Sequence, residues 1–135
     1  MNRSSILAKW HSYYFQYILD NPDKPWNYAW LSSNQNITWE IVKDNPDKPW
    51  NYHWLSSNPN ITWEIVRNNP DKPWNYNTLS ENLNITWEIV RANPDKPWNY
   101  CLLSSNKMIK AKEKFIQEEM IKQFTEKTAL NKISK

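Results

Sequence analysis

The chain has 135 residues, a formal net charge of +3 and no glycine. Enzymes commonly place glycine where a loop adopts positive φ close to a ligand, so this composition argues against a catalytic domain. Cys101 is the only cysteine, which excludes an internal disulfide and, with two distant histidines, a thiolate zinc site. We therefore expect no enzyme activity, no catalytic residues, no metal and no cofactor.

A 24-residue repeat organises the middle of the chain. The string NPDKPWNY begins at Asn21 and recurs every 24 residues as far as Asn93, and ITWEIV follows the same period from Ile37 to Ile85. A fixed period of this size is typical of stacked repeat proteins, in which each unit buries its apolar face against its neighbours. The predicted single domain, 1–135, comprises an N-terminal cap (1–12), four repeats of which the first is degenerate (13–106), and a basic C-terminal helix (107–135).

In chain order, the first predicted element is a helix over roughly 5–19, because Ile6 and Trp10 begin an apolar series with helical spacing. Ser4 or Ser5 is its expected N-cap. The end of this helix belongs to the degenerate first repeat.

Each later repeat opens with a short predicted helix. In the copy that starts at Ile37, Thr38 is the expected N-cap, and Glu40 places an acid in the first turn, where the helix dipole favours it. Asn45 precedes Pro46 and is pushed out of the α region, so the helix is about six to eight residues long.

A second short helix is predicted to follow in each repeat. Asp47 is its expected N-cap, Pro49 falls in its first turn, and Asn58 is a candidate left-handed residue after its end. Helices this short are not stable alone and must be held by stacking. The sequence therefore predicts an all-α fold, in which short helix pairs stack as an α-solenoid between longer N- and C-terminal capping helices.

The last predicted element is a helix from about 106 to 130, rich in good helix formers. Ile109, Ile116, Met120 and Phe124 form an apolar stripe, which is expected to cap the last repeat. A partner-binding or self-associating helix is the next interpretation, and membrane-surface binding the third, because the stripe lacks tryptophan. No apolar stretch reaches the roughly 18 residues of a membrane span, so we expect no membrane insertion.

Comparison between repeats separates predicted core positions from variable ones. The positions assigned to the core are Trp26/Trp50/Trp74/Trp98, Tyr28/Tyr52/Tyr76/Tyr100, Leu31/Leu55/Leu79/Leu103 and Phe15/Trp39/Trp63/Trp87. The variable positions are Ala29/His53/Asn77/Cys101 and Trp30/Trp54/Thr78/Leu102. A position that accepts side chains of such different volume is not tightly packed, so we expect both to face outward or to line the groove. The predicted partner-binding residues are Trp30, His53, Trp54, Asn77, Thr78 and Leu102, with the two tryptophans as an exposed aromatic pair.

The strings NPDKPWNY, ITWEIV and WLSSNPN resemble the tandem tryptophan- and asparagine-rich repeats of giant DNA viruses of amoebae, the mimivirus-like group. The resemblance covers about residues 13–106 and leaves out both ends. It implies a viral repeat protein, and it carries no catalytic residue over to this chain.

The expected function is that of a non-enzymatic repeat scaffold, a viral structural or host-interaction protein that binds a protein partner through its repeat surface. The alternative is a nucleic-acid-binding protein that uses exposed tryptophan and the C-terminal segment 107–135, which carries eight lysines and four glutamates. Without a recognisable signal peptide, we expect a soluble intracellular protein. If the chain is viral, its expected place is the host cytoplasm or the virion.

Overall fold

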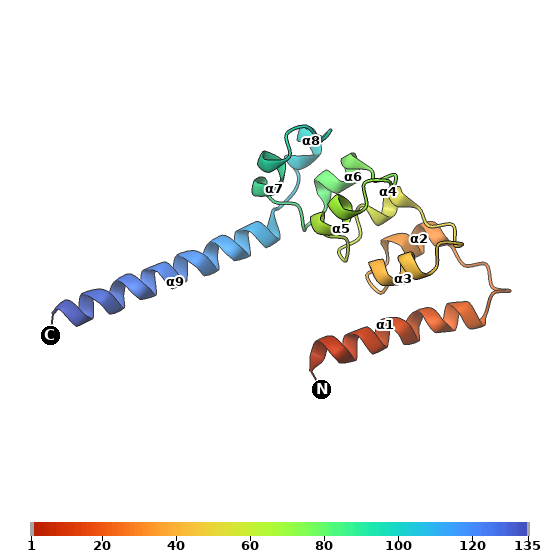
Figure 1. Cartoon of the computed structure of the whole chain (residues 1–135), viewed down its shortest axis with the longest axis horizontal. Coiled ribbons are helices and arrows are strands. Elements are labelled where there is room, and N and C mark those ends of the chain that lie inside the picture. Colours follow the sequence, from red (N-terminus) through yellow and green to blue (C-terminus); the bar gives the residue numbers. More distant parts are fainter. Residues whose placement is uncertain (1, 135) are drawn as a thin grey trace.

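The computed structural model describes residues 2–134 and is all-helical over that range. Two long helices flank a series of short ones (Figure 1). The helices are α1 (Arg3–Asp20), α2 (Tyr28–Ser33), α3 (Trp39–Asp44), α4 (Tyr52–Leu55), α5 (Trp63–Asn68), α6 (Tyr76–Glu81), α7 (Trp87–Ala92), α8 (Tyr100–Leu103) and α9 (Ile109–Ile133).

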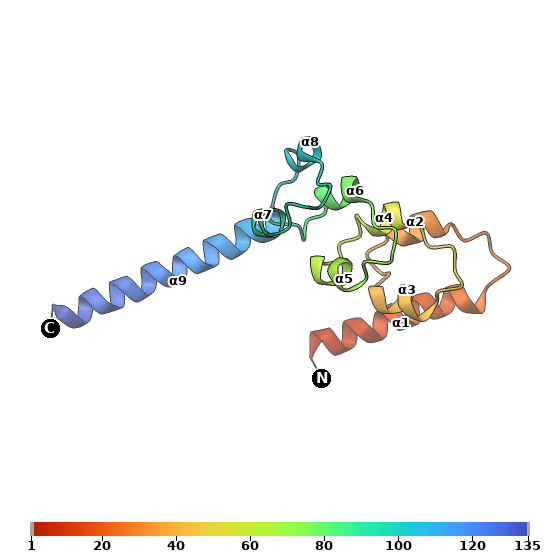
Figure 2. The ribbon, with the colours of Figure 1, turned by 45° about the horizontal axis from the view of Figure 1, so that its top comes forward.

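The short helices form two rows. The second helices of the repeats, α2, α4, α6 and α8, follow one side of the body, and α3, α5 and α7 follow the other (Figure 1, Figure 2). In both views α1 lies beside α3, whereas α9 leaves the body near α7 and projects away from it. The prediction of many short helices in a repeating pattern is confirmed.

The first helix of each repeat forms as the sequence predicts. The Thr38 hydroxyl accepts a hydrogen bond from the Ile41 N–H at 3.3 Å, and Thr62 and Thr86 cap α5 and α7 in the same way. Asn45 ends α3 with φ −128° and ψ 60°, outside the α region, as expected for a residue before proline. Both predictions are confirmed.

The predicted start of the second helix is wrong. Asn51, not Asp47, caps α4, because its side chain accepts the Trp54 N–H at 3.2 Å. The chain turns through Pro46–Pro49, where the Lys48 N–H donates to the Asn45 carbonyl at 3.2 Å and the Trp50 N–H donates to the Lys48 carbonyl at 2.8 Å. The Asp47 carboxylate instead pairs with Lys48 at 3.4 Å in this exposed turn. A proline-rigidified turn therefore separates the two helices, and the helix begins only after it.

Asn58 also differs from its prediction. Within residues 2–134 the only non-glycine residue with positive φ is Met108, so Asn58 is not left-handed. Its side chain is buried instead and hydrogen-bonds to the preceding repeat. A residue expected to end a helix is thus part of the contact between repeats.

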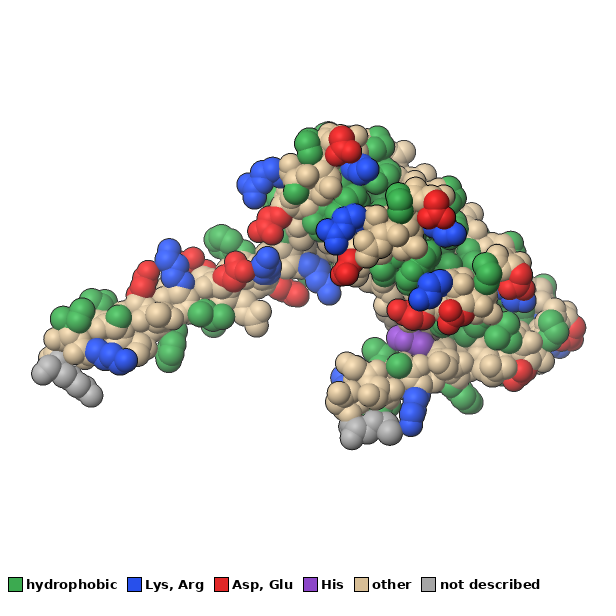
Figure 3. Space-filling view, viewed as in Figure 1, with side chains coloured by type: hydrophobic (Ala, Val, Ile, Leu, Met, Phe, Trp, Pro, Cys, Tyr) green, Lys and Arg blue, Asp and Glu red, His purple; other side chains and the backbone are tan. Residues whose placement is uncertain are grey.

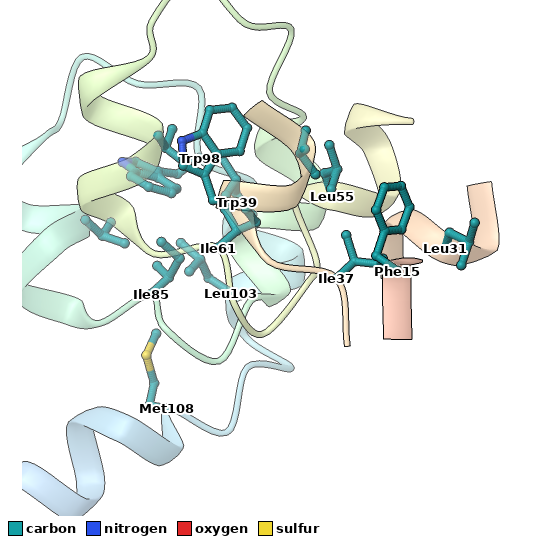
Figure 4. Close-up of a cluster of buried hydrophobic side chains, with 14 of the residues drawn as sticks. Phe15, Leu31, Ile37, Trp39, Leu55, Ile61, Ile85, Trp98, Leu103 and Met108 are labelled. Atoms are coloured by element: carbon teal, nitrogen blue, oxygen red, sulfur yellow. The ribbon is translucent and has the colours of Figure 1, made fainter. Parts of the chain in front are cut away.

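The core is elongated rather than globular. Figure 4 shows buried side chains spread along the body from Leu31 and Phe15 at one end to Met108 at the other. The leucine of every repeat is buried, as predicted, and so are the isoleucines that precede the first helices: Ile37, Ile61 and Ile85. The core therefore extends by one increment with each repeat.

Two residues of the predicted core are exposed. Trp87 is 54% exposed and Tyr100 is 64% exposed, although their equivalents Trp39 and Tyr52 are buried and half-buried. Both belong to the fourth repeat, after which the repeat sequence stops. The prediction is wrong for these two because a core position in a stack is covered only where a next repeat exists.

The N-terminal helix is longer than predicted. Its N-cap is Asn2, which accepts the Ser5 N–H at 2.9 Å, so the prediction of Ser4 or Ser5 as cap is wrong. Phe15 is buried and packs on Trp50 with ring centroids 5.7 Å apart, which confirms it as the counterpart of the later tryptophans. The rest of α1 contacts the loop before α3, where the Trp10 indole donates to the Asn36 side chain at 2.9 Å.

The C-terminal helix does not pack as predicted. It contains no buried residue, and Ile109, Ile116 and Met120 are exposed. Met108, with φ 50° and ψ 41°, takes the left-handed conformation and changes the direction of the chain just before α9 begins. The expectation that this apolar stripe packs on the last repeat is therefore wrong.

Candidate interaction surfaces

One aromatic arrangement is repeated at all three contacts between repeats. At the second contact, Trp74 lies against Trp39 of the preceding repeat, with ring centroids 5.5 Å apart, and meets the edge of Tyr52 at 5.1 Å. The third contact repeats these distances at 5.4 and 5.2 Å with Trp98. Edge-to-face and tilted ring pairs at this spacing are favourable beyond the area they bury.

Hydrogen bonds accompany these rings at each contact. The Asn75 backbone N–H donates to the Ser56 hydroxyl of the preceding repeat at 2.9 Å. The buried Asn82 amide donates to the Ser56 and Asn58 carbonyls at 2.8 and 3.1 Å and to the Ile61 carbonyl at 3.3 Å. One asparagine therefore satisfies backbone carbonyls that the loops leave without intrahelical partners.

Sequence reasoning missed the role of these serines and asparagines. Ser56 and Asn58 occur at identical places in other repeats, which could have marked them as framework residues. As polar residues at the end of the second helix, they already had a sufficient local explanation. The hydrogen-bonded partners lie 24 residues apart in the sequence, and no short sequence pattern indicates a contact over that distance. The missed contribution comes from tertiary structure.

The predicted partner-binding residues are placed on the row of second helices. Trp30 in α2 is 74% exposed and Trp54 in α4 is 42% exposed. The ring neighbour of Trp54 is His53, at 5.0 Å and nearly perpendicular, and within residues 2–134 no ring contact joins Trp30 to Trp54. The two tryptophans are thus separate exposed side chains of one face rather than a stacked pair.

The remaining predicted residues differ in exposure. Asn77 is exposed, and its side-chain oxygen accepts a hydrogen bond from Asn99 at 3.0 Å. Leu102 is half-buried. Thr78 is 8% exposed, because its hydroxyl donates to the His53 carbonyl at 2.9 Å, so the prediction that it faces outward is wrong. Binding by these residues stays a prediction.

A groove lies beside each contact between repeats, next to the proline turns. One has a volume of about 550 Å³ and runs between Trp39, Lys43 and the turn at Pro73, and the next repeats it 24 residues later with about 500 Å³. Burial raises the pKa of Tyr52 and of Tyr76, which line these grooves. The grooves therefore offer neutral phenols beside exposed ammonium and carboxylate groups.

No group of histidine, cysteine, aspartate and glutamate side chains in residues 2–134 is placed to hold a metal ion. Across the same residues, no helix combines the length and the apolar composition that a bilayer crossing requires. Comparison with family models, curated proteins and solved structures gives no match to this chain.

Proposed function

We propose that this chain is a non-enzymatic scaffold that binds another protein through the outer face of its second helices. The observation that carries the proposal is the exposure of Trp30 and Trp54 at a position where other repeats have threonine or leucine. The stack does not need a tryptophan there, and an exposed indole is a costly side chain to keep in water. Tryptophan is also enriched among residues that dominate protein–protein binding energy.

The proposed architecture behind this face is an α-solenoid, with α1 as its N-terminal cap. The same ring and amide contacts at three successive steps support a continuous stack. The hydrogen bonds of α1 to Asn34 and Asn36 support its capping role, because later repeats use those positions to bond the repeat before them. Stacks of this kind present extended binding faces.

The proposed setting follows from the resemblance of NPDKPWNY and ITWEIV to giant-virus repeats. We place the protein inside an infected amoeba, in the host cytoplasm or the virion, as a structural or host-interaction protein. The exposed Phe115, Met120 and Phe124 also support self-association through α9, with a second copy of the chain as the partner.

A capture experiment with matched variants tests the proposal. The full chain is immobilised and exposed to amoebal extract, beside a Trp30→Ala/Trp54→Ala double variant and a Tyr13→Ala control on α1, whose side chain is 73% exposed. We expect the wild type and the control to retain the same proteins and the double variant to lose them. Retention of the same proteins by all three chains would refute the assignment of this face.

A salt titration separates the nucleic-acid alternative from the proposal. On the side of α9 that Figure 3 shows, blue lysine and red glutamate side chains are interspersed. We therefore expect weak binding of a generic oligonucleotide at physiological salt. Tight binding that falls steeply as salt rises would favour the alternative instead.

A further inference from the structure

The contact between repeats has two sides, and one side is left uncovered at the end of the array. Its accepting side consists of a tryptophan, a tyrosine and a serine hydroxyl, as in Trp39, Tyr52 and Ser56. The fourth repeat repeats this side with Trp87, Tyr100 and Ser104. We call these three residues the forward face.

Every group of the forward face is accessible. Trp87 and Tyr100 have the exposures given above, and Ser104 is exposed. The Ser104 hydroxyl donates to the Tyr100 carbonyl at 2.8 Å, as Ser56 does to Tyr52, and this leaves its oxygen free to accept. Within residues 2–134 no N–H occupies that acceptor.

The segment that directly follows the fourth repeat does not provide the missing half. One period after Asn93-Pro94 the sequence reads Gln117-Glu118, so nothing ends the helix there and no NPDKPW turn forms. The helix α9 continues to Ile133 instead. The apolar groove of about 610 Å³ between α9 and Trp87 is lined also by Ile89 and Phe115 but not by Tyr100 or Ser104, so it lies beside the forward face rather than on it.

We propose that the forward face binds the second half of a repeat of this same type supplied by another polypeptide. The chemistry of that segment follows from the internal contacts. It carries a tryptophan that covers Trp87 and Tyr100, an asparagine directly after it whose backbone N–H reaches Ser104, and a second asparagine eight residues after the tryptophan, as in Trp50, Asn51 and Asn58.

This proposal is independent of the outer-face function, because the forward face lies at the end of the stack and contains none of the predicted partner-binding residues. It also differs from self-association through α9, since the binding groups belong to α7, α8 and the residue that follows α8. A polypeptide that carries the repeat thereby docks on the end of the stack through a contact that this chain already makes internally.

A peptide titration tests the proposal. A fluorescein-labelled peptide with the sequence of residues 45–58, NPDKPWNYHWLSSN, is titrated with the full chain and followed by fluorescence anisotropy. We expect saturable binding that Trp87→Ala weakens by about tenfold or more, as for an aromatic at the centre of an interface. The matched control Tyr13→Ala removes an exposed aromatic side chain from α1, outside both proposed surfaces, and should leave binding unchanged.

Two further measurements make the result decisive. Ser104→Ala removes only the hydroxyl acceptor and is expected to weaken binding severalfold, and a peptide with Trp50→Ala should not bind. Far-UV circular dichroism checks that each variant of the full chain is folded. We expect each to fold, because the substituted side chain is exposed and contributes little to the core. No binding of the wild-type peptide at millimolar concentration, or equal binding by Trp87→Ala, would overturn the proposal.

Discussion

Asn82→Ala should be among the most destabilising single substitutions in this chain. The buried Asn82 amide donates to two carbonyls of the preceding repeat and to the Ile61 carbonyl at the start of its own, and its oxygen accepts the Asn84 N–H at 2.8 Å. Each lost hydrogen bond costs about 1 kcal/mol, and a buried carbonyl left unpaired costs more. We expect the free energy of unfolding to fall by about 2–4 kcal/mol, measured by urea denaturation.

Asn77→Ala is the matched control. It removes the same kind of side chain from an exposed position of the same repeat. One hydrogen bond to Asn99 is lost there, and water can replace the missing partner. We expect a change below about 0.5 kcal/mol. If the two alanine variants unfold at the same urea concentration, the amide contacts between repeats do not stabilise the stack.

Trp74→Ala should cost about 3–5 kcal/mol, as for truncation of a large packed aromatic. The Trp74 ring lies between Trp39 and Tyr52 of the preceding repeat, and its indole N–H donates to the Asn69 carbonyl at 2.8 Å. Its loss removes one side of a contact in the middle of the array. Thermal unfolding followed by circular dichroism measures the effect.

Trp54→Ala provides the comparison. Trp54 is 42% exposed, and its ring contact is with the exposed His53 of its own helix. We expect a much smaller loss of stability, together with weaker partner binding. Equal destabilisation by the two substitutions would disprove the outward-facing assignment, and the binding face would then have to be sought on the first helices, around Lys43, Arg67 and Arg91.

Local chemistry explains which parts of the fold were predictable. The threonine caps and the Asn-Pro ends of the first helices depend on neighbouring residues, and the structure confirms them. The cap of the second helix was mispredicted because Asp47 and Asn51 are both good capping residues, and only the hydrogen-bonded turns through Pro49 decide between them.

The parts that were not predictable depend on tertiary contacts. Thr78 was assigned to the surface from its variability, yet its small side chain fits beneath a helix of the preceding repeat and bonds to the His53 carbonyl. Trp87 was assigned to the core from its repetition, yet the element that covers its equivalents is missing. A residue repeated in every unit makes the same contacts only inside the array. At an end of the array one neighbouring repeat is missing, so repetition alone does not predict the burial of the residue there.

Backbone hydrogen exchange tests most directly whether contacts between repeats hold the chain together. The N–H groups of Asn51, Asn75 and Asn99 each donate to a serine hydroxyl of the preceding repeat at 2.9 Å, whereas the Asn27 N–H, in the first repeat, makes no hydrogen bond within residues 2–134. The predicted result is slow exchange at the first three positions and fast exchange at Asn27. Exchange at all four positions with the same fast rate would contradict the account.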